Sequence, residues 1–198
     1  KFLMQEQLQK LIAITRHGAR TTLAPAPDND KYECDYFALI SQNMSDNQLK
    51  LNYDIANPQQ GNCQLGDLIN AGSIQHQNLG YYLKKNYGAL LSKNNLKSYY
   101  RSSFAHRTLG SIKSLLDYIF QDQDYETHVA DENQDSMEIK NCKYNDKWLE
   151  YTRNIPIVIK NEDNLIKIKQ ILNIDSDEYF DWWMIYDYLE SKRFMLMS

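Results

Sequence analysis

The hydrophobic pattern of the chain begins with a short apolar run and continues with longer stretches of helical period. Leu11-Ile12-Ala13-Ile14-Thr15 is apolar and partly β-branched, which is typical of a buried strand that ends at the next residues. Residues 65–91 predict one long helix, or two that are interrupted near Gly72 or Gly80. The apolar positions with helical spacing in this stretch are Leu65, Leu68, Ile69, Ile74, Leu79, Tyr82, Leu83 and Leu90.

The same order is repeated further along the chain. Ser98-Tyr99-Tyr100 predicts a second strand that ends at Arg101, and the apolar positions between Leu109 and Ile119 predict a helix directly after it. Strand, loop and helix in repeated succession is typical of a parallel α/β sheet. We therefore expect an α/β fold: a largely parallel sheet with helices on both sides. Placement of residues 11–15 and 98–101 in different sheets would contradict this expectation.

The remaining segments predict a long loop and a second, mainly helical part. Residues 23–61 are rich in Pro, Asn, Asp and Gln and are expected to form a long surface excursion. Thr127-His128-Val129 predicts a short third strand, and helices are expected near Trp148, over residues 166–172 and over residues 176–193. We assign residues 1–140 to the first part of an α/β core and residues 141–198 to part of a helical cap, and we expect the rest of the core to be missing from this chain. Because such a sheet leaves an unpaired edge, we expect the chain alone to be poorly stable.

Composition and charge exclude some classes of function. The chain has 198 residues and a net charge of −4, with a pI near 5.6, so bulk attraction to nucleic acid or to an anionic membrane is not expected. No apolar run is long enough for a membrane span. The three cysteines Cys34, Cys63 and Cys142 allow one disulfide with one cysteine left over, or partners elsewhere. Together with the possible glycosylation triplet Asn43-Met44-Ser45, they favour a secreted or lysosomal protein.

The segment Arg16-His17-Gly18-Ala19-Arg20 carries the clearest chemical signal in the sequence. Two guanidinium groups flank one imidazole, and a glycine lets the backbone turn tightly. Guanidinium groups bind phosphate oxygens through paired hydrogen bonds, and a neutral imidazole among them can attack phosphorus. The alternative is a surface loop with scattered basic residues.

A second basic segment lies between the predicted strand at residues 98–100 and the following helix. It runs from Arg101 to Thr108, with Ser102 or Ser103 as expected helix caps. Since the carboxyl ends of neighbouring parallel strands meet at one crevice, Arg101 is expected to reach the same phosphate as Arg16 and Arg20. Taken alone, such a segment is more often an ordinary capped helix start than a ligand site.

These segments resemble a known family. Arg16-His17-Gly18-Ala19-Arg20 resembles the Arg-His-Gly-X-Arg-X-Pro signature of the histidine acid phosphatases, which include prostatic and lysosomal acid phosphatases and phytases. Residues 101–108 resemble that family's Arg-Ser-Thr-Asp-X-Asp-Arg-Thr segment, and residues 65–87 are similar to its Leu-Thr-X-X-Gly-X-X-Gln-X-X-X-Leu-Gly helix. Asn141-Cys142 looks like a family cysteine that pairs with a distant one, so we expect Cys142 to pair outside this chain rather than with Cys63.

The resemblance implies a role for each matching residue. His17 is the expected nucleophile, and Arg16, Arg20 and Arg101 form the expected phosphate clamp. The implied reaction transfers the phosphoryl group of a phosphate monoester to histidine, and water then hydrolyses the phosphohistidine. No cofactor or metal is implied, and the oligomeric state is not readable from the sequence.

The sequence also departs from the family pattern, and this keeps alternatives open. Thr22 replaces the family's proline, and Ser103, Phe104 and His106 replace Thr, Asp and Asp. The family's proton donor lies in a His-Asp pair, and the chain has no such dipeptide. A catalytically incomplete phosphate-binding relative therefore remains an alternative, as does a phytase-like or mutase-like relative. The helical segment at residues 65–91 and the Arg101 segment favour the acid-phosphatase branch.

Other residues have weaker claims to a function. His76, His106 and His128 are expected to be structural or surface histidines, with His106 close enough in sequence to Arg101 to support it. The aromatic residues of the last helix could line a substrate entrance, but residues at this spacing more often form the core, here of the cap. The acidic turn near residue 131 could offer a substitute acid, but such a turn is usually solvated. The residues concerned are Trp182, Trp183, Tyr186 and Tyr188, and Asp131, Glu132 and Asp135.

Overall fold

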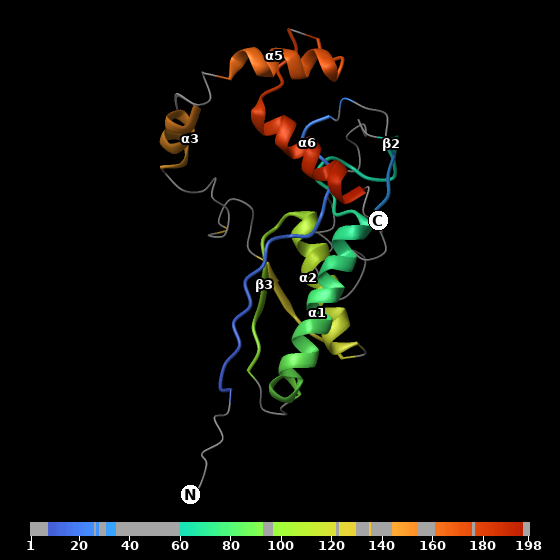
Figure 1. The fold of residues 1–198 in the computed structure, drawn as a ribbon. Coiled ribbons are helices and arrows are strands. Elements are labelled where there is room, and N and C mark those ends of the chain that lie inside the picture. Colours follow the sequence, from blue (N-terminus) through green and yellow to red (C-terminus); the bar gives the residue numbers. More distant parts are fainter. Residues whose placement is uncertain are drawn as a thin grey trace, which may run out of the picture.

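The computed structural model describes residues 8–25, 27, 31–34, 60–92, 97–121, 123–129, 135, 144–153, 161–175 and 177–195. The glycosylation triplet at residues 43–45, the acidic residues 131 and 132, and Cys142 lie outside these ranges. Within them, helices alternate with short parallel strands in the first two thirds of the chain, and helices alone follow (Figure 1).

Two long helices form the main packed unit of the described chain. Helix α1 spans Asn70–Leu91 without interruption, and helix α2 spans His106–Phe120. Apolar side chains three or four residues apart put one stripe of each helix against the other, where Leu83 packs with the α2 residues Leu115, Leu116 and Ile119. The prediction of a helix in residues 65–91 is confirmed, although its first turn begins only at Asn70.

The strands form two small parallel pairs. Strand β3 (Tyr100–Ser102) pairs with β4 (Thr127–Val129) in parallel, with Arg101 opposite His128. Strand β1 (Lys31–Tyr32) pairs in parallel with β2 (Gln60–Gly61). The predicted strand at residues 127–129 is confirmed, and the strand predicted at residues 98–100 is present two residues later. A mixed fold with a parallel sheet is compatible with the predicted α/β class.

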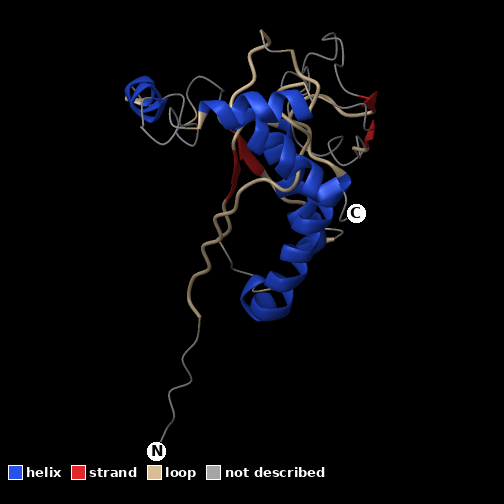
Figure 2. Ribbon diagram, turned by 45° about the horizontal axis from the view of Figure 1, so that its top comes forward, coloured by secondary structure: helices blue, strands red, loops and turns tan. Residues whose placement is uncertain are grey.

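The strand predicted at residues 11–15 is not present. The segment is extended but belongs to neither strand pair, and it runs past β3 without a ladder of its own (Figures 1 and 2). Leu11 packs against the α1–α2 core, whereas Ile12 and Ile14 are 69% and 90% exposed. A strand forms only where a neighbouring backbone satisfies its polar groups, and among the described residues β3 has β4 as its ladder partner.

The two helices α1 and α2 lie together on one side of the β3–β4 pair (Figures 1 and 2). A second layer of helices on the other side of the sheet is not seen among the described residues, so helices on both sides remain a prediction.

The predicted surface excursion at residues 23–61 contains a buried element. Tyr32 in β1 is 1% exposed, and it packs with Cys34, Cys63 and Ile69 in a second apolar cluster. Cys34 and Cys63 form a disulfide, with their Cα atoms 5.4 Å apart. The disulfide holds the chain around β1 against the chain around β2, and this is why a polar stretch of sequence contributes to a core.

Three helices occupy the C-terminal third of the described chain. They are α3 (Asn145–Arg153), α5 (Glu162–Ile171) and α6 (Trp182–Met195), close to where the sequence predicted helices. Helix α6 contacts the first part of the chain, because Phe194 and Met195 pack against the cluster that holds the disulfide. A division into core and cap at residue 140 stays a prediction.

Candidate active site

The loop at residues 16–20 packs against the start of α1 through its main chain. A Cβ atom at Gly18 would lie 2.3 Å from the carbonyl oxygen of Gly72, and one at Gly72 would lie 2.1 Å from the carbonyl oxygen of Ala19. Both positions therefore require glycine, because any side chain would push the loop and the helix apart. The amide of Ile69 donates to the carbonyl of Ala19 at 3.1 Å, which continues the contact beyond the two glycines.

The imidazole of His17 is half-buried and is held in one tautomer. Its Nδ1 lies 2.8 Å from the carbonyl oxygen of Gly18, and a carbonyl can only accept, so Nδ1 carries the proton. The lone pair is then on Nε2, which is the nitrogen available to attack an electrophile.

The same imidazole is kept neutral over most of the acidic range. The pKa of His17 is lowered from 6.5 to about 4, chiefly by burial; the hydrogen bond to Gly18 opposes this, and the positive charges of Arg107, Arg16 and Arg20 contribute to the lowering. These guanidinium groups are therefore close enough to act on the ring electrostatically. A neutral imidazole among three cations is an arrangement suited to an anionic substrate.

The first predicted clamp residue, Arg16, is exposed, and the second, Arg20, is buried in an ion pair. Arg20 places Nη2 2.5 Å and Nη1 3.3 Å from the two carboxylate oxygens of Asp187 on α6. Nη1 also donates to the carbonyl of Thr21 at 2.7 Å, whereas the buried Nε has no hydrogen-bond partner among the described residues. Arg20 thus joins the loop at residues 16–20 to the last helix, and among the described residues it keeps one unsatisfied donor.

The third predicted clamp residue, Arg101, lies on β3. Its Nη2 donates to Oδ1 of Asp135 at 2.8 Å, and the side chain of Asp135 is fully buried. The expectation that Asp135 is solvated is therefore wrong: burial makes this carboxylate dependent on its hydrogen bond and on its cation. Participation of Arg101 in a phosphate clamp stays a prediction.

Sequence reasoning did not single out Arg107 as a site residue. Its charge has the largest effect of any arginine on the pKa of His17, and its Nη1 would lie 3.4 Å from a Cβ atom at Gly66. The signal was present in the sequence, since Arg107 belongs to the segment that resembles the second family motif. The helix α2 that carries it begins at His106, with Ala105 rather than Ser102 or Ser103 at the N-cap.

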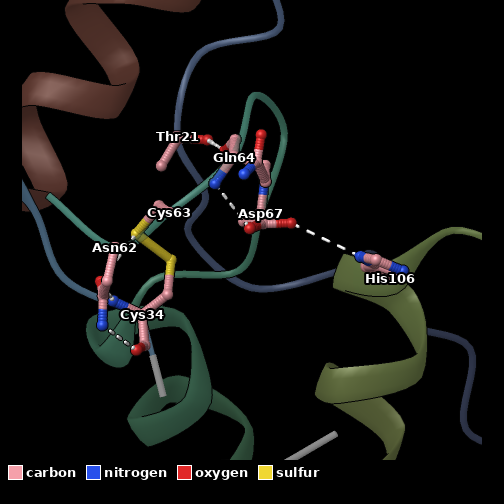
Figure 3. Close-up of a disulfide and its surroundings, with 7 residues drawn as sticks. All are labelled: Thr21, Cys34, Asn62, Cys63, Gln64, Asp67 and His106. Atoms are coloured by element: carbon pink, nitrogen blue, oxygen red, sulfur yellow. Dashed lines mark hydrogen bonds and ion pairs between the residues drawn. A yellow bond between two sulfur atoms is a disulfide. The ribbon is translucent and has the colours of Figure 1, made fainter. Parts of the chain in front are cut away.

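The other histidines have structural partners. His76 is 4% exposed on α1, and its Nε2 donates to the carbonyl of Arg16 at 3.1 Å. His106 places Nδ1 3.6 Å from Oδ1 of Asp67, whose other carboxylate oxygen accepts from the amide of Gln64 (Figure 3). Of the two expected positions for His76, structural or at the surface, the structure shows the first.

Figure 3 also shows how the disulfide borders this region. Asn62, which precedes Cys63, exchanges two hydrogen bonds of 2.8 Å with the main chain of Cys34. The turn that carries Asp67 follows directly, and the amide of Thr21 donates to the carbonyl of Asp67 at 2.9 Å. The disulfide thereby supports the turn against which the loop at residues 16–20 rests.

The remaining candidates are distributed outside the loop. His128 stacks on Tyr99 at 4.6 Å between ring centroids, at the edge of the β3–β4 pair. The aromatic residues of α6 are not uniformly core: Trp183 and Tyr186 are exposed, and Trp182 and Tyr188 are partly buried. The described residues contain no group of three or more His, Cys, Asp or Glu side chains that could hold a metal ion. No helix among them is long and apolar enough to cross a membrane.

A neutral histidine on an arginine-containing loop, set against the N-terminal turns of two helices, is an arrangement suited to a phosphoryl group. The family model of the histidine phosphatase superfamily (branch 2) matches residues 7–192. The match covers nearly the whole chain, and the chain belongs to this superfamily. Membership of this superfamily supports phosphatase-type chemistry, that is, a hydrolase that binds phosphate. A search among curated proteins finds no match to the chain.

Proposed function

We propose that the protein is a phosphomonoester hydrolase of the acid-phosphatase type that works through a phosphohistidine at His17. The observation that carries the proposal is the state of this imidazole: Nδ1 donates to the carbonyl of Gly18, so the lone pair lies on Nε2, and the charges of nearby arginines act on the ring. A nucleophile that is neutral down to a pH of about 4 suits catalysis in acid.

The reaction proceeds in two balanced steps. Nε2 of His17 forms a bond to phosphorus, the bond from phosphorus to the ester oxygen breaks, and the leaving alkoxide takes a proton from an acid. A water molecule then attacks the phosphohistidine and gives one proton to the acid that was deprotonated in the first step, the bond from phosphorus to nitrogen breaks, and inorganic phosphate leaves. Arg16, Arg20 and Arg101 stabilise the negative charge on the phosphoryl oxygens in both steps.

The acid that protonates the leaving group is not assigned to a residue of this chain. A His-Asp dipeptide, which the family resemblance leads us to expect, is not in the sequence. For this reason the second candidate function is a phosphate-binding relative that does not turn over. The neutral, single-tautomer imidazole favours the enzyme, because binding alone does not need a nucleophile that presents Nε2. A phytase-like substrate remains a further alternative within the same chemistry.

A secreted or lysosomal location is part of the proposal. The disulfide between Cys34 and Cys63 supports it, since stable disulfides form in oxidising compartments. A lysosomal lumen would also supply the acidic pH at which the protonated leaving-group acid and the neutral His17 coexist.

The first test measures hydrolysis of an aryl phosphate at pH 5 by the wild type, His17→Ala and the control His128→Ala. An aryl leaving group needs little protonation, so its turnover reports on the nucleophile and the clamp rather than on the acid. We expect His17→Ala to lose at least about three orders of magnitude in turnover, and His128→Ala to keep the wild-type rate. Equal activity of wild type and His17→Ala would show that His17 is not the nucleophile.

Trapping separates the two candidate functions. Acid-labile phosphate on His17 after brief incubation with a radiolabelled aryl phosphate supports the enzyme. Vanadate or phosphate binding without any phosphohistidine supports the binding protein.

A further inference from the structure

The peptide group that precedes His17 is held from helix α1. Its carbonyl belongs to Arg16 and accepts a hydrogen bond of 3.1 Å from Nε2 of His76. His76 is buried in the second turn of the helix, so its position is fixed by the packing around it. The direction of this carbonyl, and with it the backbone before His17, is therefore defined by a rigid element.

The peptide group that follows His17 is held from helix α2. The amide of Gly18 donates to Oγ of Ser111 at 3.0 Å, and the same hydroxyl donates to the carbonyl of Arg107 at 2.6 Å. Ser111 is buried, and its hydroxyl proton is used within its own helix, so its lone pairs face the amide of the loop.

The next peptide group, between Gly18 and Ala19, connects the loop to the tautomer of the nucleophile. Its N–H, on Ala19, donates to Oε1 of Gln75 at 2.9 Å. Its C=O, on Gly18, accepts the proton of Nδ1 of His17 at 2.8 Å. Because a trans peptide group is planar and its N–H and C=O point in opposite directions, holding one end aims the other.

From this geometry we infer that Gln75 is a positioning residue that sets the tautomer of His17. Its amide oxygen holds the Gly18–Ala19 peptide so that the Gly18 carbonyl faces Nδ1, and the lone pair of the imidazole is thereby directed to Nε2. The hydrogen-bond partner of a ring nitrogen decides the tautomer: a carbonyl beside Nδ1 can only accept, so it keeps the proton on Nδ1. The catalytic consequence rests on the proposed function, whereas the tautomer can be measured without any activity.

The position of Gln75 makes the inference testable by substitution. Gln75 lies on the exposed side of α1, so its contact with the loop is made by the hydrogen bond and not by core packing. Gln75→Leu removes the acceptor with little change in volume. Gln75→Glu keeps an oxygen at the same place. Gln77→Leu alters another exposed glutamine of the same helix, two residues away, and is the matched control.

The direct measurement is the ¹⁵N NMR spectrum of the histidine ring nitrogens at pH 7, with the His17 signals assigned by their loss in His17→Ala. In the wild type, in Gln77→Leu and in Gln75→Glu, we expect His17 to be protonated on Nδ1. In Gln75→Leu we expect a substantial population protonated on Nε2 instead. An unchanged Nδ1–H tautomer in Gln75→Leu overturns the inference, whatever the activity of the protein.

Kinetics provide the second readout. With an aryl phosphate, Gln75→Leu should lower kcat by at least about tenfold, because a catalytic histidine in the wrong tautomer costs up to about four orders of magnitude. KM should stay within about threefold of the wild-type value, because the clamp is intact, and Gln75→Glu should recover most of kcat. A rise in KM with unchanged kcat contradicts a positioning role. If His17→Ala is as active as the wild type, the proposed function fails, and the NMR result still decides the role of Gln75.

Discussion

A histidine nucleophile in an acidic medium has to meet two demands that pull against each other. It must stay unprotonated, yet it must sit among groups that attract an anion. In the proposed mechanism the same arginines serve both purposes at His17, because their charges lower the pKa of the imidazole and would also attract a phosphate. Burial is the largest cause of the lowered pKa, and the hydrogen bond to Gly18 raises the pKa.

The lowered pKa of His17 predicts an acid-sensitive contribution to stability. In the folded protein the group has a pKa of about 4, against 6.5 for an unperturbed histidine. Between these values the unfolded chain binds a proton that the folded chain does not, so stability falls as the pH drops from about 6.5 to about 4. Below both values no further loss comes from this group.

We therefore expect His17→Gln, which carries no titrating ring, to lose less stability than the wild type between pH 7 and pH 4. Urea unfolding at pH 7, 5.5 and 4 checks this. Part of the acid loss should remain in the variant, because burial also lowers the pKa of His76. Parallel plots of unfolding free energy against pH for the two proteins would mean that His17 is not held neutral by the fold.

At the residue scale the sequence predicted the histidine and three arginines but not their partners. The Arg-His-Gly-X-Arg pattern is local, so it can be read without a fold. Gln75 and Ser111 act on the loop from 56 and 93 positions away. Gln75 matches the glutamine of the family's helix motif, but the contact of either side chain with the loop cannot be read from the sequence. Only the packing of two helices against the loop shows that they matter.

At the element scale, helix α6 is joined to the nucleophile loop by one buried carboxylate. Asp187 accepts two hydrogen bonds from Arg20 and a third from the amide of Leu23 at 2.7 Å. The sequence placed a helix here but gave no sign of this pair, since 167 residues separate Arg20 from Asp187. The contact ties a predicted cap element to the predicted clamp.

Removal of this carboxylate should be costly. Asp187→Ala leaves the buried guanidinium of Arg20 without its counter-ion, and we expect a loss of about 3–5 kcal/mol in the free energy of unfolding. The control is Glu190→Ala on the same helix, whose pair with Arg193 is largely exposed and spans 3.7 Å, so its loss should be below about 1 kcal/mol. Urea unfolding of the three proteins at pH 7 measures both.

Phosphate offers an internal check on the same variant. If Arg20 belongs to an anion site, added phosphate should recover more stability in Asp187→Ala than in the wild type, because the freed guanidinium binds it. Similar losses in Asp187→Ala and Glu190→Ala would show that the buried pair is not important for stability.

At the scale of the whole molecule, helices were predictable and strand pairing was not. A helix satisfies its backbone from within, so the apolar period of residues 109–119 was sufficient to place α2. A strand depends on a partner elsewhere in the chain. An apolar run such as residues 11–15 therefore shows a preference for extended backbone but not whether a neighbouring strand pairs with it. The polar stretch around Tyr32 gives the opposite case, because a disulfide and a short strand pair bury a residue that pattern alone assigned to a surface loop.

The segment at residues 11–15 allows the buried-strand prediction and the observed arrangement to be compared directly. In the structure Ile14 is 90% exposed, whereas Leu11 packs against the α1–α2 core. We expect Ile14→Asn to change the free energy of unfolding by no more than about 0.5 kcal/mol. Leu11→Ala should cost about 1–2 kcal/mol, since it removes partly buried apolar surface. A strand buried on both faces would reverse this order, because an asparagine at position 14 would then be a buried polar group with no partner. Urea unfolding of the 198-residue chain and of the two variants decides between the buried strand and the exposed segment. If Ile14→Asn lowers the free energy of unfolding more than Leu11→Ala does, the buried strand is supported and the exposed segment is refuted.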